Sequence, residues 1–167
     1  SRGNAYLIEA DGVGPLLLEA GLPIKTLRER LNFGLSGLAG CLVSHEHGDH
    51  SKAVKDLLKA GVDCYMSPGT AEALGVKGHH RINALYAGMR HSMGWDSWKI
   101  LPFPHEHDAE QPYGFIIAYE GDRLLFIPDT AYVKERFFGV TTIAIECNNI
   151  EDILSKNIRS GSLPAVD

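Results

Sequence analysis

The segment HEHGDH at positions 45–50 constrains this chain more than any other part of it. It places three histidines and an aspartate within six residues. A single serine separates it from an apolar run of strand length at 38–43. In extended backbone alternate side chains point the same way, so His45 and His47 can bind one cation. Gly48 lets the chain turn and present the last two residues of the segment to a second cation. The spacing therefore predicts a two-metal site at the end of a buried strand.

The remaining chain alternates segments of strand and helix composition, which predicts a mixed α/β fold. Strands are expected at 5–10, 16–19, 38–43, 62–66, 98–103, 113–120, 123–127 and 142–145, and helices at 24–31, 53–60, 70–74 and 150–158. The turns at 11–14 and 121–122 predict two hairpins. We expect little regular structure in 75–95 and a buried strand at 142–145. Because ligands bind beyond the carboxyl ends of strands in such sheets, the polar clusters that follow the strands should converge.

Composition narrows the class of protein further. A length of 167 residues fits one domain, and no apolar run approaches the roughly 20 residues that a membrane span needs. With a formal net charge of −5, the surface as a whole does not attract nucleic acid, so such a partner would have to bind to a local region of the surface. The three cysteines are far apart in the sequence, and residues 1–10 carry no secretory signal. We expect a cytoplasmic protein with no membrane partner.

The HxHxDH pattern after a buried strand resembles the defining motif of the metallo-β-lactamase superfamily. The resemblance runs from 3–6 to 146–149 and implies an αββα sandwich with a hydrolytic metal centre. The next metal histidine of the family follows a strand, and here His107 or His105 could supply it. His107 is chosen, because a His-Asp-Ala run before Pro-x-Gly-Phe resembles the bacterial exonuclease-like and tRNase Z-like branch. The bridging carboxylate of the family matches Asp129 in the context Pro-Asp-Thr.

The resemblance implies a ligand set for two divalent ions. The first ion would take His45, His47 and His107, and the second Asp49 and His50, with Asp129 as the bridge. Two such ions lower the pKa of a bridging water, which Asp49 would orient as the nucleophile. Mixed imidazole and carboxylate ligands suit zinc, with manganese or iron as alternatives.

Two further residues remain open at this stage. Glu146 resembles a glutamate that supports the site in the tRNase Z-like branch, but it can equally be an ordinary carboxylate at a strand end. Cys147 resembles a thiol of the core rather than a ligand.

One departure from the family concerns the last metal histidine, because the sequence has no histidine after His107. Either the last part of the fold is missing or the second ion has only three protein ligands. We expect the former, so that residues 1–167 form a single metallo-β-lactamase-like domain that lacks its last part.

The substrate is suggested by a stretch at 73–95 that has basic residues and no acidic one. Lys77 and Arg81 in this stretch are predicted to contact phosphate groups, although a solvated loop would have the same composition. The leading hypothesis is a metal-dependent phosphodiesterase, a nuclease acting on nucleic acid. The alternatives are a thioester or lactone hydrolase resembling glyoxalase II, and a metal-binding domain without catalysis. Nothing in the sequence indicates an oligomeric state.

Overall fold

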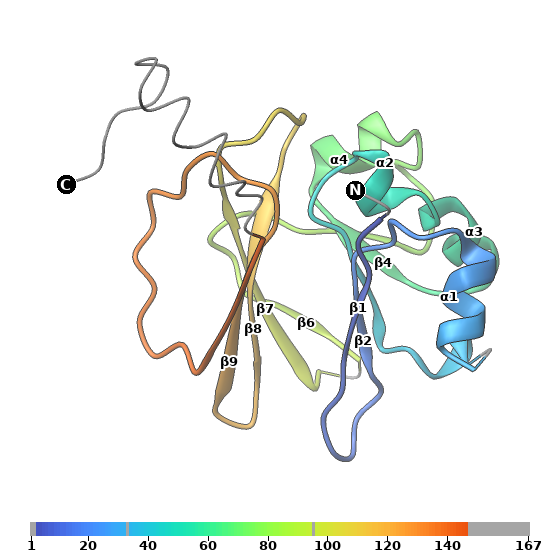
Figure 1. The fold of residues 1–167 in the computed structure, drawn as a ribbon, viewed down its shortest axis with the longest axis horizontal. Coiled ribbons are helices and arrows are strands. Elements are labelled where there is room, and N and C mark those ends of the chain that lie inside the picture. The colour runs from blue at the N-terminus through green and yellow to red at the C-terminus, as the bar shows by residue number, and fades with distance from the viewer. Residues whose placement is uncertain (1–2, 33, 95, 147–167) are drawn as a thin grey trace, which may run out of the picture.

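Two five-stranded sheets face each other in this chain (Figure 1). The structure, a computed structural model, describes residues 3–32, 34–94 and 96–146. The first sheet has the order β1-β2-β3-β4-β5, with strands Tyr6–Ile8, Leu16–Leu18, Gly40–Leu42, Cys64–Met66 and Ile82–Ala84. The second has the order β10-β9-β8-β7-β6, with strands Thr142–Ile145, Asp122–Ile127, Tyr113–Tyr119, Trp98–Pro104 and His91–Met93. The expected mixed α/β architecture is confirmed.

The first sheet is mostly parallel and carries its helices on the outer face (Figure 1). These helices are α1 Ile24–Arg30, α2 Gly48–Ser51, α3 Val54–Lys59 and α4 Pro68–Ala73. Their apolar side chains, including Leu27, Leu57 and Ala71, form one core with the outward side chains of β2, β3 and β4. Among the described residues, no helix combines the length and the apolar character that a bilayer span requires.

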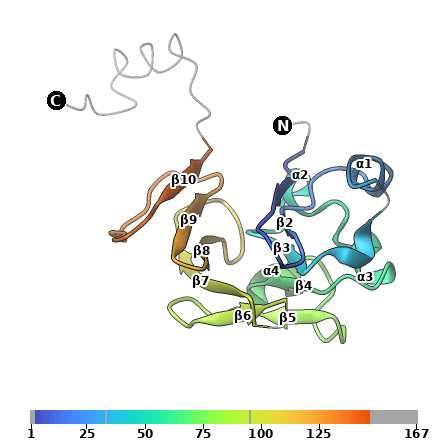
Figure 2. The same ribbon diagram turned by 90° about the horizontal axis from the view of Figure 1, so that it is seen from below.

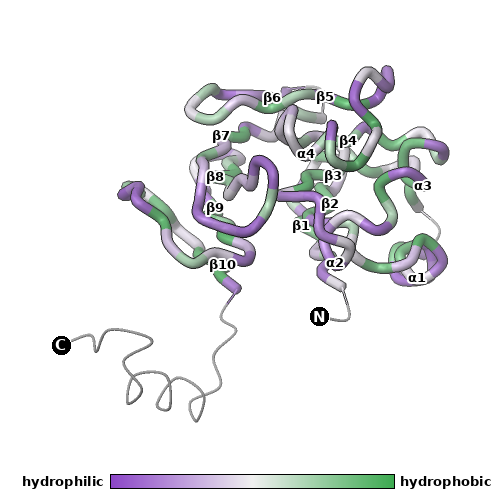
Figure 3. Tube along the Cα trace, turned by 90° about the horizontal axis from the view of Figure 1, so that it is seen from above, coloured by the Kyte–Doolittle hydropathy of each residue, from purple (hydrophilic) through white to green (hydrophobic). Residues whose placement is uncertain are grey.

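A second core lies between the two sheets. It joins Leu16, Leu18 and Leu42 of the first sheet to Ile100, Phe115 and other inward side chains of the second. Figure 2 views the two sheets from below, with β5 and β6 close together, and Figure 3 shows hydrophobic residues concentrated along the strands. This packing brings the ends of β3, β7 and β9 to the same side of the molecule. The predicted ligands lie on the loops that follow these strands.

Two expectations about secondary structure require correction. The stretch 75–95 contains β5 and β6, which extend the two sheets at their edges. The strand at 142–145 forms as predicted, but its side chains are exposed rather than buried, with Ile143 63% exposed. Among the described residues, β10 lies at the edge of the sheet and pairs with β9 alone. The helix predicted at 150–158 and Cys147 lie outside the described residues.

Candidate metal centre

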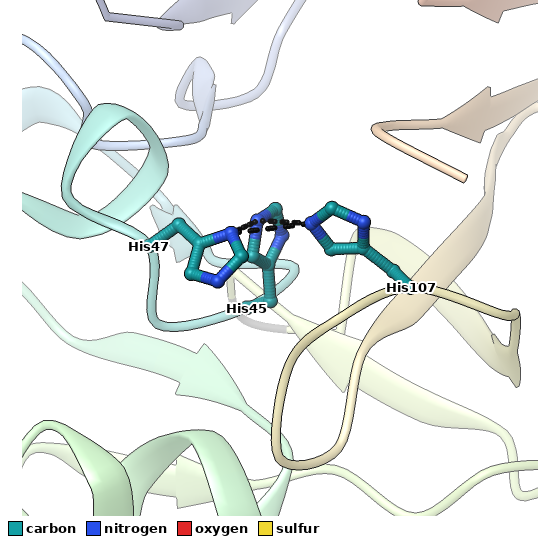
Figure 4. Close-up of side chains that lie close together, drawn as sticks. All are labelled: His45, His47 and His107. Carbon is teal, nitrogen blue, oxygen red and sulfur yellow. Dashed lines mark hydrogen bonds between the residues drawn. The ribbon is translucent and has the colours of Figure 1, made fainter. Parts of the chain in front are cut away.

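The predicted ligands lie on loops that follow strands of both sheets. His45 and His47 come after β3, at the start of α2, whereas His107 follows β7 and Asp129 follows β9. Because these strands end on the same side of the molecule, residues more than sixty positions apart come together (Figure 4). The convergence expected at the carboxyl ends of the strands is present.

Three ring nitrogens form an almost equilateral triangle. His45 Nε2 lies 3.2 Å from His47 Nδ1 and 3.2 Å from His107 Nε2, and the last two atoms are also 3.2 Å apart (Figure 4). In a tetrahedral site with metal–nitrogen bonds of about 2.0–2.1 Å, neighbouring nitrogens lie roughly 3.3 Å apart. The triangle therefore has the size of one face of a tetrahedral zinc site, and the donor set fits the cation that the motif implies.

The environment favours the neutral form of His45 and His107. Burial, together with the nearby His50, His107 and His47, lowers the pKa of His45 to about 3. The pKa of His107 is also lowered, first by burial and then by His47. Ser44 Oγ lies 2.8 Å from His45 Nδ1, and a proton on that nitrogen leaves Nε2 with its lone pair free. The cluster can therefore accept a cation near neutral pH without first releasing protons.

A second group of possible ligands adjoins the first. His45, His50 and Asp129 offer atoms within 4.8 Å of one another, and His50 Nε2 is 3.3 Å from Asp129 Oδ2. Asp49 lies slightly farther off, with its Oδ2 3.9 Å from His50 Nε2. Burial raises the pKa of Asp129, but a hydrogen bond with Glu146 and the charge of His50 lower it, and the net shift is downward. Glu146 is thus in contact with the site.

Glu19 is a site residue that the sequence analysis missed. It is fully buried just after β2, in a left-handed conformation with φ of 64°, and its Oε2 lies 3.7 Å from His50 Nδ1. The Ser44 N–H donates to the same carboxylate at 3.4 Å. Burial raises the pKa of Glu19. Burial alone would lower the pKa of His50, but the contact with Glu19 raises it on balance. An acidic residue directly after an all-leucine strand was the available signal, because a buried carboxylate needs a partner.

Glu19→Ala is expected to weaken metal binding at the position next to His50 by roughly 10- to 100-fold, as loss of a group that orients a ligand does. Competition with a chromophoric chelator measures this affinity. Glu9→Ala, a change at a residue of the exposed β1–β2 hairpin, is the control. Equal affinity in both variants would contradict a role for Glu19 in holding His50.

Gly21 brings three backbone segments together beside the cluster. The Asn4 N–H donates to the Asp49 carbonyl at 2.7 Å, and the Gly21 N–H donates to the Asn4 carbonyl at 2.8 Å. The Ala20 N–H donates to the His50 carbonyl at 2.7 Å. A Cβ atom on Gly21 would overlap the carbonyl group of Asp49. Only glycine fits this approach, which places the loop of Asp49 and His50.

We expect Gly21→Ala to lower the free energy of unfolding by about 1–3 kcal/mol, because the added methyl group has to displace backbone. Urea denaturation measures the change. Gly37→Ala is the matched control, since a Cβ there meets no atom within 4 Å. If both variants unfolded at the same urea concentration, the tight packing at Gly21 would not be a constraint.

Hydrogen bonds also connect the ligand loops to one another. Glu46 Oε1 accepts from the Glu110 N–H at 2.7 Å and so joins the loop of His45 to that of His107. The Thr130 hydroxyl donates to the Glu106 carbonyl at 3.1 Å, which joins the loop of His107 to that of Asp129. The site is preorganised by contacts that do not involve the ligand side chains.

The alternative histidine, His105, does not join the cluster. Its ring is buried, its centre lies 6.3 Å from that of His107, and neither ring nitrogen makes a hydrogen bond of good geometry. The structure therefore brings together His107, and not His105, with the histidines of the motif.

Lys77 and Arg81 are not brought to the cluster. Lys77 Nζ lies 2.8 Å from Glu72 Oε2, and Arg81 Nη1 lies 2.9 Å from Asp63 Oδ1. Arg81 precedes β5, which runs parallel to β4 and β3, so it lies at the amino ends of these strands, whereas the histidines follow the carboxyl ends. A phosphate contact by these two residues stays a prediction.

Known proteins resemble this chain in sequence and in fold. Exodeoxyribonuclease WalJ of Streptococcus pneumoniae is 29% identical over 176 residues, which cover 97% of this chain and 63% of that protein. A UPF0173 metal-dependent hydrolase of Deinococcus radiodurans is 32% identical over 150 residues, covering 81% of this chain and 63% of that protein. The chain thus spans less than two thirds of the length of these relatives.

Among solved structures, the metallo-β-lactamase fold protein YhfI from Bacillus subtilis superposes with a TM-score of 0.63 at 18% identity, over 79% of this chain and 56% of that one. The family described as the beta-lactamase superfamily domain matches residues 17–149. This match covers the motif and all of the described strands except β1 and the first residue of β2, and from it we conclude that the chain belongs to the β-lactamase superfamily.

Proposed function

We propose that this protein is a metal-dependent hydrolase that cleaves phosphodiester bonds in nucleic acid. The observation that carries the proposal is the triangle of ring nitrogens at 3.2 Å beside the group of His45, His50 and Asp129. The relatives named exodeoxyribonuclease support the substrate class. Since the chain spans only part of their length, activity and substrate are proposed for the whole protein.

In this proposal His45, His47 and His107 hold one divalent cation, and Asp49, His50 and Asp129 hold a second. Zinc suits these ligands best, with manganese or iron as alternatives. Two bound cations supply a water of lowered pKa and offset negative charge on the attacked group. Asp49, whose side chain is 29% exposed, would accept a hydrogen bond from the attacking water.

The protein's other contributions concern orientation. Ser44 fixes the ring of His45 through its 2.8 Å contact, and Glu19 faces the ring nitrogen of His50 that points away from Asp129. We also propose that residues 1–167 form one domain lacking the last part of the fold, and that a ligand from that part completes the second position.

One observation favours the alternative of a thioester or lactone hydrolase. The cavity beside His50 is small, about 110 Å³, and apolar side chains such as Phe126, Pro128 and Ile145 form most of its wall. A small acyl group fits such a space better than a nucleobase does.

The test combines metal analysis with three assays. Metal content is measured on residues 1–167 and on a protein that includes whatever its gene encodes after Asp167. Each is assayed with zinc or manganese on bis-p-nitrophenyl phosphate, single-stranded DNA and a thioester. Cleavage of the first two with two bound ions supports the proposal. Cleavage of the thioester alone favours the alternative, and absence of bound metal from both proteins would leave only a domain without catalysis.

The predicted phosphate contacts have their own test. The double variant Lys77→Ala, Arg81→Ala is expected to weaken binding of single-stranded DNA and to reduce its salt dependence, as loss of phosphate contacts does. The control is Lys25→Ala, Arg28→Ala in α1, on the outer face of the first sheet. Identical affinity and salt dependence in the two double variants would remove Lys77 and Arg81 from the proposed interface.

A further inference from the structure

Asn4 is a polar side chain that neither the motif nor the ligand groups include. Its backbone is fixed on both sides, by the bond from its N–H to the Asp49 carbonyl and by the bond that it accepts from Gly21. Its side-chain Nδ2 lies 3.1 Å from His50 Nε2. That ring nitrogen is the atom that also faces Asp129 at 3.3 Å, so the Asn4 amide borders the second ligand group.

A neighbouring hydroxyl contacts the other end of the amide. The Tyr6 O–H donates to Asn4 Oδ1 at 3.3 Å, and the NH₂ group faces His50. An amide NH₂ group has only donors and no lone pair for a cation. Once His50 Nε2 is taken by a cation, this donor is available to an oxygen atom of a molecule bound beside it.

We propose that Asn4 is a substrate-binding residue whose side-chain N–H donates to a non-bridging oxygen of the scissile phosphate, and that Tyr6 orients it. The inference rests on the proposed phosphodiesterase function and adds a specific contact to it.

The composition of the cavity lined by both side-chain partners of Asn4, Tyr6 and His50, supports this assignment. Tyr6, His50 and Glu146 line the cavity of about 110 Å³, and its described lining contains no lysine or arginine. Asp49 and Asp129 add further negative charge nearby. Apart from His50, which the proposed function assigns to a cation, the described lining offers a phosphate group no cationic side chain, so the protein itself contributes neutral donors.

Tyr6 is suited to the orienting role. Burial, and then the carboxylates of Glu146, Glu19 and Asp129, raise the pKa of Tyr6, so its hydroxyl keeps its proton across the neutral range. The ring also packs edge-on against Phe126, with ring centres 5.8 Å apart, which restricts its position. Tyr6 thus acts through Asn4, as a positioning residue.

The experiment compares Asn4→Ala, Asn4→Asp and Tyr6→Phe with the metal-loaded wild type. Binding of inorganic phosphate is measured by calorimetry, and kcat and KM on bis-p-nitrophenyl phosphate are measured separately. Controls are Asn83→Asp and Tyr86→Phe, matched changes at exposed residues on and just after β5. Metal content and circular dichroism verify that every variant is folded and loaded.

Asn4→Ala is expected to weaken phosphate binding and raise KM by roughly 10- to 100-fold at unchanged metal content, which is the usual cost of a lost hydrogen bond to a charged group. Asn4→Asp should cost more, since it adds a negative charge, and Tyr6→Phe less, roughly three- to tenfold. The two control variants should match the wild type.

The outcomes separate this inference from the function on which it rests. Unchanged phosphate affinity and KM in a metal-loaded Asn4→Ala protein would overturn it. Loss of bound metal in that variant would also overturn it, because Asn4 would then act on His50. A wild type that binds phosphate in an Asn4-dependent way but cleaves no phosphodiester would refute the proposed function and leave the anion contact standing.

Discussion

Replacing His45 with alanine is expected to remove bound metal from the position that it forms with His47 and His107. His45 is the one residue that belongs to both ligand groups found among the described residues, and its side chain is fully buried. Loss of groups that merely orient a ligand costs roughly 10- to 100-fold in affinity, so loss of a ligand itself should cost more than about 100-fold. Elemental analysis after gel filtration, with one or two equivalents of zinc added, measures the effect.

The control for this change is His80→Ala, which removes an exposed histidine remote from the cluster in sequence and absent from both ligand groups. It should retain the metal content and the hydrolytic rate of the wild type. A His45→Ala protein that still held two ions per chain would show that the triangle of nitrogens is not the metal site.

Acid is expected to destabilise the metal-free protein between about pH 6.5 and pH 4. Burial, followed by His107, lowers the pKa of His105 to about 4, and that of His45 is about 3, against an ordinary value of 6.5. Below pH 6.5 these histidines bind protons in the unfolded chain but remain neutral in the folded protein. Their contribution to the free energy of unfolding is therefore fully present above that pH and is lost as the pH falls below it. His50 acts in the opposite sense, because its folded pKa is raised.

Below pH 6.5 His50 is protonated in both states and adds no slope, so His45 and His105 together lower the free energy of unfolding by up to about 2.7 kcal/mol per pH unit. Urea denaturation at pH 7, 6 and 5, with a chelator present, tests this. His105→Leu should flatten the dependence and stabilise the protein at pH 7 by about 1 kcal/mol, because it removes two buried nitrogens without good partners. His80→Leu, at an exposed histidine, is the control. A His105→Leu protein as sensitive to acid as the wild type would contradict the assignment.

The parts of the fold that the sequence predicted are those with strong local signals. The hairpin of β8 and β9 follows from alternating apolar residues around Gly121, and α3 from the spacing of Val54, Leu57 and Leu58. The motif histidines were placed on a loop between strand and helix, where they lie. His107 was chosen over His105 by resemblance, and the structure brings it to the cluster.

The missed features depend on contacts between distant segments. Glu19 and Asn4 are far from the motif in sequence, and they face His50 only because β1 and β2 pack beside β3. The strands β5 and β6 are three residues each, too short to show a period, and they form because an existing sheet offers them a pairing edge. The exposure of β10 reflects its place in the sheet rather than its apolar composition.

The division of the nitrogen triangle between two sheets has a mechanical consequence. His45 and His47 belong to loops of the first sheet and His107 to a loop of the second, so a cation held by all three ties the halves of the sandwich together. Its binding energy then opposes any opening of the interface between the sheets. Amide hydrogens of β7 and β8 should therefore exchange with solvent more slowly when the ion is present, even though neither strand supplies a ligand from within its own span.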